Sequence, residues 1–123
     1  MLLSFDFTSD VPLYQQLRNQ IVLGIADGRL HPGDRLPTVR ALAEESGVNT
    51  MTVSKAYQLL KAEGYLTADR RSGSVIAAPR GARGPTAAQR EALRLCLSEL
   101  RLAGMAREKI LALCVELCGG DER

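Results

Sequence analysis

Two short segments with helical periodicity, almost adjacent in the sequence, set the strongest limit on the fold. Residues 39 to 45 or 46 and residues 50–63 repeat apolar side chains at spacings of three and four, as helices with one buried face do. Only Gly47, Val48 and Asn49 separate them. Gly47 can end the first helix in a left-handed conformation, and Asn49 can cap the second. The sequence therefore predicts a helix-turn-helix unit.

Another helix is predicted before this unit. Apolar side chains recur on one face through residues 12–27, where Pro12 suits the first helical position and Gly28 suits the stop. The stretch 30–37 contains two prolines and a glycine, which exclude a helix and leave room for at most a very short strand. Thr38 then offers a cap for the next helix.

After the helix-turn-helix unit the pattern changes from helix to strand. Residues 65–68 and 74–77 are short strand-like runs, and the polar stretch between them contains Arg70 and Arg71. We expect a small hairpin with a basic tip. The residues that follow are rich in Gly and Pro and have no apolar side chain larger than Ala, so 78–85 is predicted to be a linker.

Two further helices are predicted beyond the linker. Thr86 and Gln89 have the spacing of a capping box, and leucines repeat from there to about residue 103. Gly104 interrupts the pattern before a second apolar stripe. A two-helix hairpin cannot bury so many apolar side chains by itself, so we expect it to pair with a second copy. The candidate dimerisation residues are Leu93, Leu97, Leu100, Ile110, Leu113, Cys114 and Leu117.

Composition and charge fit a small globular protein without indicating its function. Of 123 residues 46% are apolar and 24% charged, which excludes disorder and most multidomain enzymes. Residues 1–78 hold eight basic and eight acidic side chains, and residues 79–123 hold eight basic and six acidic ones, which gives +2. Neither a signal peptide nor a membrane span is recognised, so we expect a cytoplasmic protein with no membrane partner.

No residue pattern indicates catalysis or a cofactor. His31 is the sole histidine, and it lies in a turn with no cysteine or acidic pair placed by the sequence to make a site with it. No phosphate-binding glycine motif, nucleophile elbow or zinc-ligand spacing is present. The sequence therefore predicts neither an enzyme, nor a metal site, nor a cofactor.

The second helix of the helix-turn-helix unit has a polar face that suits DNA. With its apolar residues turned inward, hydroxyl, amide and basic side chains point outward at its N-terminal end. Residues at that end reach base edges when such a helix enters the major groove. Gln58 continues the face, which as a helix pattern alone is equally consistent with a solvated surface. The candidate DNA-binding residues here are Asn49, Thr50, Met51, Thr52, Ser54 and Lys55.

Two neighbouring basic elements favour the DNA-binding interpretation. Arg40 projects from the first turn of the preceding helix, near where that helix would cross the DNA backbone. Arg70 and Arg71, followed by Ser72 and Gly73, occupy the predicted hairpin tip and can enter a minor groove or contact phosphate. Each basic element alone is a weak indication, but their convergence on one side of a small motif is stronger.

Several motifs resemble those of the GntR family of bacterial transcription regulators in order and spacing, over about residues 11–77. The resemblance implies a winged helix-turn-helix DNA-binding domain over residues 1–77 and a helical dimerisation tail over residues 86–123. It also implies that Arg40, the segment from Asn49 to Ser54 and the wing contact operator DNA. The motifs are 12–17 (PLYQQL), 28–43 (GRLHPGDRLPTVRALA), 47–49 (GVN), 52–57 (TVSKAY) and 63–66 (EGYL).

The short two-helix tail is similar to that of the YtrA branch of this family. The resemblance implies a homodimer that binds an inverted-repeat operator in double-stranded DNA as a repressor, and the regulated operons of that branch often encode ABC-type transporters. The expected fold is mainly α with a small β-hairpin wing. The sequence does not indicate a small-molecule effector. The wing departs from the family's usual Gly-x-Gly pattern, because only Gly73 is kept.

Two alternatives stay open at this stage. Cys114 and Cys118 are four residues apart on the last predicted helix, and Cys96 lies on the helix before it, so the three can form a thiol or metal sensor. The interpretation that we favour is that they are small apolar residues that fill a helix contact. The other alternative is a winged-helix module that uses its tail to bind another protein.

Overall fold

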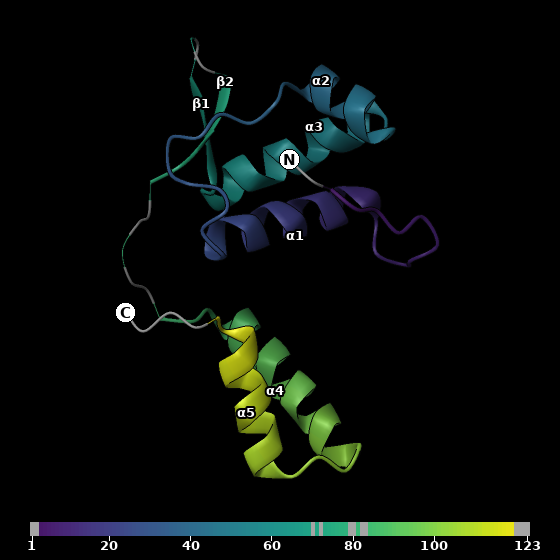
Figure 1. Cartoon of the computed structure of the whole chain (residues 1–123), viewed down its shortest axis with the longest axis vertical. Coiled ribbons are helices and arrows are strands. Elements are labelled where there is room, and N and C mark those ends of the chain that lie inside the picture. The colour runs from purple at the N-terminus through teal and green to yellow at the C-terminus, as the bar shows by residue number, and fades with distance from the viewer. Residues whose placement is uncertain (1–2, 70, 72, 79–80, 82–83, 120–123) are drawn as a thin grey trace. The chain divides into compact units, whose positions relative to one another are not determined.

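The helices and strands belong to two units, residues 1–80 and residues 81–123 (Figure 1). The computed structural model describes residues 3–69, 71, 73–78, 81 and 84–119. Within these residues, no helix is both long enough and apolar enough to span a membrane. The elements are α1 (Leu13–Ala26), α2 (Val39–Ser46), α3 (Thr50–Glu63), β1 (Leu66–Asp69), β2 (Gly73–Ile76), α4 (Ala87–Leu102) and α5 (Arg107–Leu117). The predicted fold class, mainly α with a small β-hairpin, is confirmed.

Local capping chemistry sets the ends of α2 and α3. The Thr38 hydroxyl accepts a hydrogen bond from the Ala41 amide at 3.0 Å, and the Asn49 side chain accepts one from the Thr52 amide at 2.8 Å. Gly47 ends α2 with a φ of 77°, a left-handed conformation that costs glycine little. The predicted helix-turn-helix unit is therefore confirmed, including both caps.

The start of α1 differs from the prediction by one position. Pro12 is the N-cap and not the first helical residue, because its ψ of 149° is extended. Its carbonyl nevertheless accepts the amide hydrogen bonds of Gln15 and Gln16, both at 3.0 Å, and so begins the helix. Leu17 and Ile21, on the face that contacts α3, are fully buried.

The sheet pairs β1 with β2 in antiparallel register, from Leu66 opposite Ile76 to Asp69 opposite Gly73. β1 begins one residue later than the predicted run, because the Tyr65 amide still donates to a helical carbonyl, that of Leu60, at 2.9 Å. β2 begins one residue earlier than predicted, at Gly73. The very short strand allowed before α2 is a single antiparallel bridge between Arg35 and Val75.

The core of the first unit joins all of these elements. Helix α3 lies between α1 and α2 and contacts β1 as well (Figure 1). Every apolar side chain of α3 that the periodicity turns inward is buried, as predicted. The buried cluster consists of Leu17, Ile21, Leu36, Leu42, Ala43, Val48, Val53, Ala56, Tyr57, Leu60, Leu66 and Ile76.

The second unit is a hairpin of α4 and α5. The predicted capping box is present, since the Gln89 amide donates to the Thr86 hydroxyl and the Thr86 amide donates to the Gln89 side chain, both at 3.0 Å. Ile110 is the one buried side chain among the described residues of α4 and α5. Large apolar side chains therefore stay exposed on this unit: Leu93, Leu95, Leu102, Leu111, Val115 and Leu117.

The predicted dimerisation residues fall into two groups. Five of them are already buried or half-buried within the single chain, in which α4 packs against α5. Leu93 and Leu117 are exposed. The five are Leu97, Leu100, Ile110, Leu113 and Cys114.

Candidate nucleic-acid interface

The N-terminal end of α3 presents the polar side chains that the sequence singled out. Thr50 and Met51 are exposed, Met51 to 81%, whereas Thr52 and Ser54 are half-buried. Arg40 is exposed on the first turn of α2. An exposed methionine on the first turn of a helix is free to contact a thymine methyl group in the major groove.

Asn49 has a structural task in addition to the predicted contact with DNA. Its Oδ1 atom accepts the amide hydrogen bond of Thr52 and so caps α3. An ordinary side-chain amide also carries two N–H donors on its nitrogen. A contact between Asn49 and a base or phosphate would therefore use the Nδ2 group.

Lys55 is exposed, as predicted, but its ammonium group is held against another helix. The Lys55 Nζ atom lies 4.1 Å from the centre of the Tyr14 ring, on the first turn of α1. A cation over an aromatic face at this distance is attracted by the negative charge density of the ring. Periodicity identified the exposed face of α3 but not this contact with α1.

The wing begins with a turn stabilised by Asp69. Its Oδ1 atom accepts a hydrogen bond from the Arg71 amide at 2.8 Å, and Gly73 follows with a φ of 76°. Arg71 and Gly73 are both exposed. Two more candidate residues of the wing, Arg70 and Ser72, lie outside the residues that the structure describes.

A groove of about 430 Å³ runs between α3 and the wing, and we call it the α3–wing groove. It brings Ser54 of the predicted site together with Arg71 and Gly73, and it adds two cations that the sequence analysis did not select, Arg35 and Lys61. In the part of the chain that the structure describes, none of its three cations forms an ion pair. The lining residues are Arg35, Leu36, Thr38, Val39, Ser54, Tyr57, Gln58, Lys61, Arg71, Gly73 and Ser74.

A sequence signal for Lys61 exists. Ser54, Gln58 and Lys61 follow one another at spacings of four and three, so they share one face of α3. The helical pattern that selected Ser54 therefore extends to Lys61. Arg35 has no comparable local signal, because its position depends on the pairing of its segment with β2.

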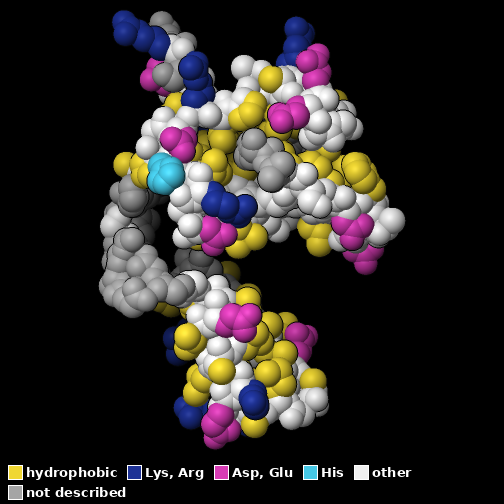
Figure 2. Space-filling model, viewed as in Figure 1, with side chains coloured by type: hydrophobic (Ala, Val, Ile, Leu, Met, Phe, Trp, Pro, Cys, Tyr) yellow, Lys and Arg dark blue, Asp and Glu magenta, His cyan; other side chains and the backbone are white. Residues whose placement is uncertain are grey.

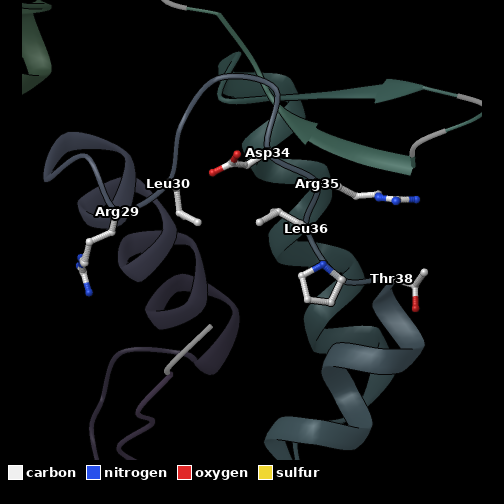
Figure 3. Close-up of a pocket in the computed structure, with 7 residues that line it drawn as sticks. Arg29, Leu30, Asp34, Arg35, Leu36 and Thr38 are labelled. Atoms are coloured by element: carbon white, nitrogen blue, oxygen red, sulfur yellow. The ribbon is translucent and has the colours of Figure 1, made fainter.

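A second hollow, of about 730 Å³, lies beside the segment before α2. Leu30 and Leu36 point toward one another across it, whereas Arg29 and Arg35 point away (Figure 3). Asp34 accepts a hydrogen bond from the His31 amide at 2.8 Å. Leu30 and Leu36 thus face this hollow, whereas Arg35 lines both the hollow and the α3–wing groove.

Tyr57 fixes the segment before α2 to the middle of α3. Its hydroxyl donates a hydrogen bond to the Pro37 carbonyl at 2.6 Å. Burial raises the pKa of Tyr57 to about 12, so the hydroxyl keeps its proton at neutral pH. This contact positions Thr38 and Arg40, which follow Pro37, relative to α3.

The charged side chains of the first unit are unevenly spread over its visible face. Figure 2 shows Lys and Arg side chains at the end of the unit formed by the wing and α2, with some acidic side chains beside them. The same view shows many hydrophobic side chains on the surface of α4 and α5.

The three cysteines of the second unit differ in exposure. Cys96 and Cys118 are exposed and Cys114 is half-buried. Among the described residues, no three His, Cys, Asp or Glu side chains form a group that would hold a metal ion.

Comparison with known proteins gives matches to bacterial regulatory proteins. Residues 13–76 match the family described as "Bacterial regulatory proteins, gntR family". The HTH-type transcriptional repressor YtrA of Bacillus subtilis (strain 168) is 33% identical over 89% of this chain and 86% of its own length. The uncharacterized HTH-type transcriptional regulator YdcR of Escherichia coli (strain K12) is 50% identical over 52% of this chain, but the match spans only 14% of YdcR.

Solved structures of similar fold cover one or both units. A transcriptional antiterminator from Listeria monocytogenes EGD-e has a TM-score of 0.85 and 28% identity, over 100% of this chain and 97% of that chain. YtrA from Sulfolobus acidocaldarius, a GntR-family transcription factor, has a TM-score of 0.60 and 32% identity, over 94% of this chain and 95% of that chain. AraR(DBD) in complex with operator ORX1 has a TM-score of 0.55 and 26% identity, over 63% of this chain and 96% of that chain.

Proposed function

Because this chain belongs to the GntR family of bacterial regulatory proteins, we propose that it is a transcriptional repressor that binds operator DNA as a homodimer. Like its relatives, it is a regulator and not an enzyme. The observation that carries the proposal is the exposed polar N-terminal end of α3, flanked by Arg40 on α2 and Arg71 on the wing.

The parts of this surface would have different tasks. Thr50, Met51, Ser54 and Lys55 would contact base edges or the adjoining phosphates in the major groove. Arg40 would fix the docking through the backbone, and the wing, with Arg71 and the sequence-predicted Arg70, would anchor at the minor groove or at phosphate. AraR(DBD), which shares the fold of the first unit, is described in complex with an operator, and this supports DNA as the partner.

Dimerisation is proposed for the second unit. Its exposed leucines and valine are too many for a hairpin that meets only water, and Leu102 and Leu117 are exposed to 88% and 73%. Two copies related by a two-fold axis would bind two half-sites in opposite orientation, which corresponds to an inverted repeat. We therefore propose residues 86–123 as the dimerisation tail, and residues 1–77 as the DNA-binding domain.

The regulatory outcome follows from the relatives. The similarity to the repressor YtrA supports repression over activation. Control of a transporter operon is proposed only through the resemblance to the YtrA branch. A thiol-responsive variant of this function would use Cys96 or Cys118, which are exposed, and its test is whether oxidation changes DNA binding in the wild type but not in Cys→Ser variants.

The experiment is a titration of the purified protein with duplex fragments, among them the region upstream of its own gene, in the presence of competitor DNA. An inverted-repeat footprint on one fragment, lost in the Arg40→Ala and Thr50→Ala variants, is the expected result. Weak binding that is equal for all fragments would contradict an operator-binding regulator. It would favour the alternative of a module that binds another protein through its tail.

A further inference from the structure

The proposed placement of the first unit on DNA limits where the DNA backbone can run. If α3 lies in the major groove and the wing reaches the adjoining minor groove, the phosphodiester strand that separates these grooves must pass between α3 and the wing. That space is the α3–wing groove. This inference therefore rests on the proposed function and goes on to name residues that bind this strand.

Arg35 is held in the groove by backbone pairing. The Leu36 amide donates to the Ser74 carbonyl at 2.9 Å, and the Ile76 amide donates to the Asp34 carbonyl at 2.8 Å. Side chains alternate along an extended segment, and Leu36 is buried, so Arg35 must point away from the core. Figure 3 shows this orientation.

Lys61 approaches the same groove from α3. It lies on the last turn of the helix, is exposed, and follows Ser54 and Gln58 along one helical face. Gln58 Nε2 lies 3.4 Å from the Ser54 hydroxyl and donates to it, so these two polar side chains already face each other along the groove.

The charge of the groove suits an anion. Arg35, Lys61 and Arg71 line it from three different segments of the chain, and no carboxylate side chain is among the described residues of its lining. The acids nearest to these cations in sequence have other partners. Asp34 accepts a hydrogen bond from the His31 amide, Glu63 forms an ion pair with Arg18, and Asp69 accepts a hydrogen bond from the Arg71 amide. Three like charges around a space of about 430 Å³ repel one another until an anion enters. DNA supplies such anions as a row of phosphates, each of which carries one negative charge.

We propose that the α3–wing groove binds the phosphodiester strand between the major and minor grooves of DNA, with Arg35 and Lys61 as phosphate-binding residues. The Ser54 hydroxyl and the Gln58 amide lie on the same wall of the groove and offer hydrogen bonds to the strand. Phosphate contacts of this kind fix register and strength without reading sequence.

The test compares Arg35→Ala, Lys61→Ala and the double variant with wild type, on an operator duplex and on an unrelated duplex, over a range of salt concentrations. Each single change should weaken binding to both duplexes by about tenfold. Each should also reduce the slope of log affinity against log salt by about 1, while the ratio of the two affinities stays the same. Arg35→Lys, which keeps the charge, should restore most of the slope and guards against a folding defect.

Arg29→Ala is the matched control. Arg29 is also an exposed arginine near the segment before α2, but it points away from the hollow in Figure 3 and its Nη2 atom lies 3.2 Å from the Asp27 carboxylate. This variant should keep the wild-type affinity and slope. Ethylation of the phosphates between the two grooves should interfere with binding of wild type and less with binding of Arg35→Ala.

The outcomes separate this inference from the function it rests on. Operator binding by wild type with an unchanged salt slope in the double variant would overturn the inference and leave the proposed function standing. Salt-dependent binding without sequence preference that is lost in the double variant would contradict the proposed function but support the groove. Saturable binding of inorganic phosphate that needs Arg35, with an unchanged slope for duplexes, would assign a free anion and overturn the inference.

Discussion

The ammonium group of Lys55 lies 4.1 Å from the centre of the Tyr14 ring, so a cation of the proposed recognition helix α3 is held against α1. An unrestrained lysine samples many rotamers, and ordering its side chain when DNA binds costs conformational entropy. Tyr14 restricts this freedom before any partner arrives. The contact thus couples the packing of α1 on α3 to the position of a charge at the DNA-facing surface.

Tyr14→Leu removes the aromatic face beneath the Lys55 ammonium. We expect a loss of about 0.5–1 kcal/mol in the free energy of unfolding and weaker binding to DNA, because the lysine is no longer held in place. Tyr14→Phe keeps the ring and should behave like wild type in both respects. Urea denaturation and DNA titration at one salt concentration measure the two effects. Equal results for the Leu and Phe variants would contradict a role for the ring.

Tyr57 predicts a loss of stability at high pH. Its hydroxyl is buried and bonded to the Pro37 carbonyl, and its pKa is raised to about 12 from an ordinary value of 10.0. Between these values the unfolded chain releases the Tyr57 proton while the folded chain keeps it, so the free energy of unfolding falls as the pH rises. The contribution of the protonated Tyr57 to the free energy of unfolding is therefore fully present below pH 10 and is lost as the pH rises to 12.

Tyr57→Phe is the matched variant for that titration. It should cost about 1 kcal/mol at pH 7, because the Pro37 carbonyl loses its hydrogen bond, and it should flatten the decline between pH 10 and 12. The measurement compares the urea midpoints of wild type and Tyr57→Phe across this pH range. Lysines and the other tyrosines titrate in both proteins, so their contribution cancels in the difference. The same steep decline in both would exclude Tyr57 as the cause.

Asn49 has both a cap and a proposed contact with DNA, and two substitutions separate these tasks. Asn49→Ala removes the acceptor for the Thr52 amide and should destabilise the fold by about 1 kcal/mol. Asn49→Asp keeps the acceptor and therefore the stability, but it places a negative charge where phosphates would approach. We expect normal thermal unfolding and weakened DNA binding for Asn49→Asp. Unchanged DNA affinity in this variant would remove Asn49 from the interface.

The helix-turn-helix unit could be predicted from the sequence because its boundaries depend on local chemistry. Thr38 and Asn49 each bond to an amide three residues ahead, and Gly47 adopts its left-handed conformation without a distant partner. The strands could be predicted only to within one residue. Their register depends on Gly73 and on the bridge between Arg35 and Val75, which join segments far apart in the chain.

Only those residues of the candidate site that share one face of a single helix could be predicted from the sequence. Contacts between different segments could not. Periodicity identifies which side of α3 is exposed, but it carries no information on the Tyr14 ring beneath the Lys55 ammonium or on Arg35, which lines the same groove as Lys61. The same limit applies to α5. The sequence predicts its apolar stripe as one surface, whereas Ile110 is 5% exposed within the unit and Leu117 is 73% exposed.

The exposed leucines of the second unit lead to a prediction for the oligomeric state. Leu117→Glu places a charge on the proposed dimer surface without touching the buried Ile110, so helix content should be unchanged while the dimer dissociates. Gln89→Glu is the control, since it adds the same charge at an exposed position where Glu still completes the capping box. Sedimentation equilibrium and circular dichroism measure the two properties.

Dissociation should also weaken operator binding, because two linked DNA-binding units gain affinity from their effective concentration and two separate ones do not. We expect Leu117→Glu to lose the operator footprint but to keep weak, salt-dependent binding to single half-sites, whereas Gln89→Glu keeps both. Ile110→Ala, in contrast, should cost about 2–5 kcal/mol in the stability of the hairpin and lower its helix content. A Leu117→Glu protein that stays dimeric would move the interface away from this end of α5, to the surface around Leu95 and Leu102.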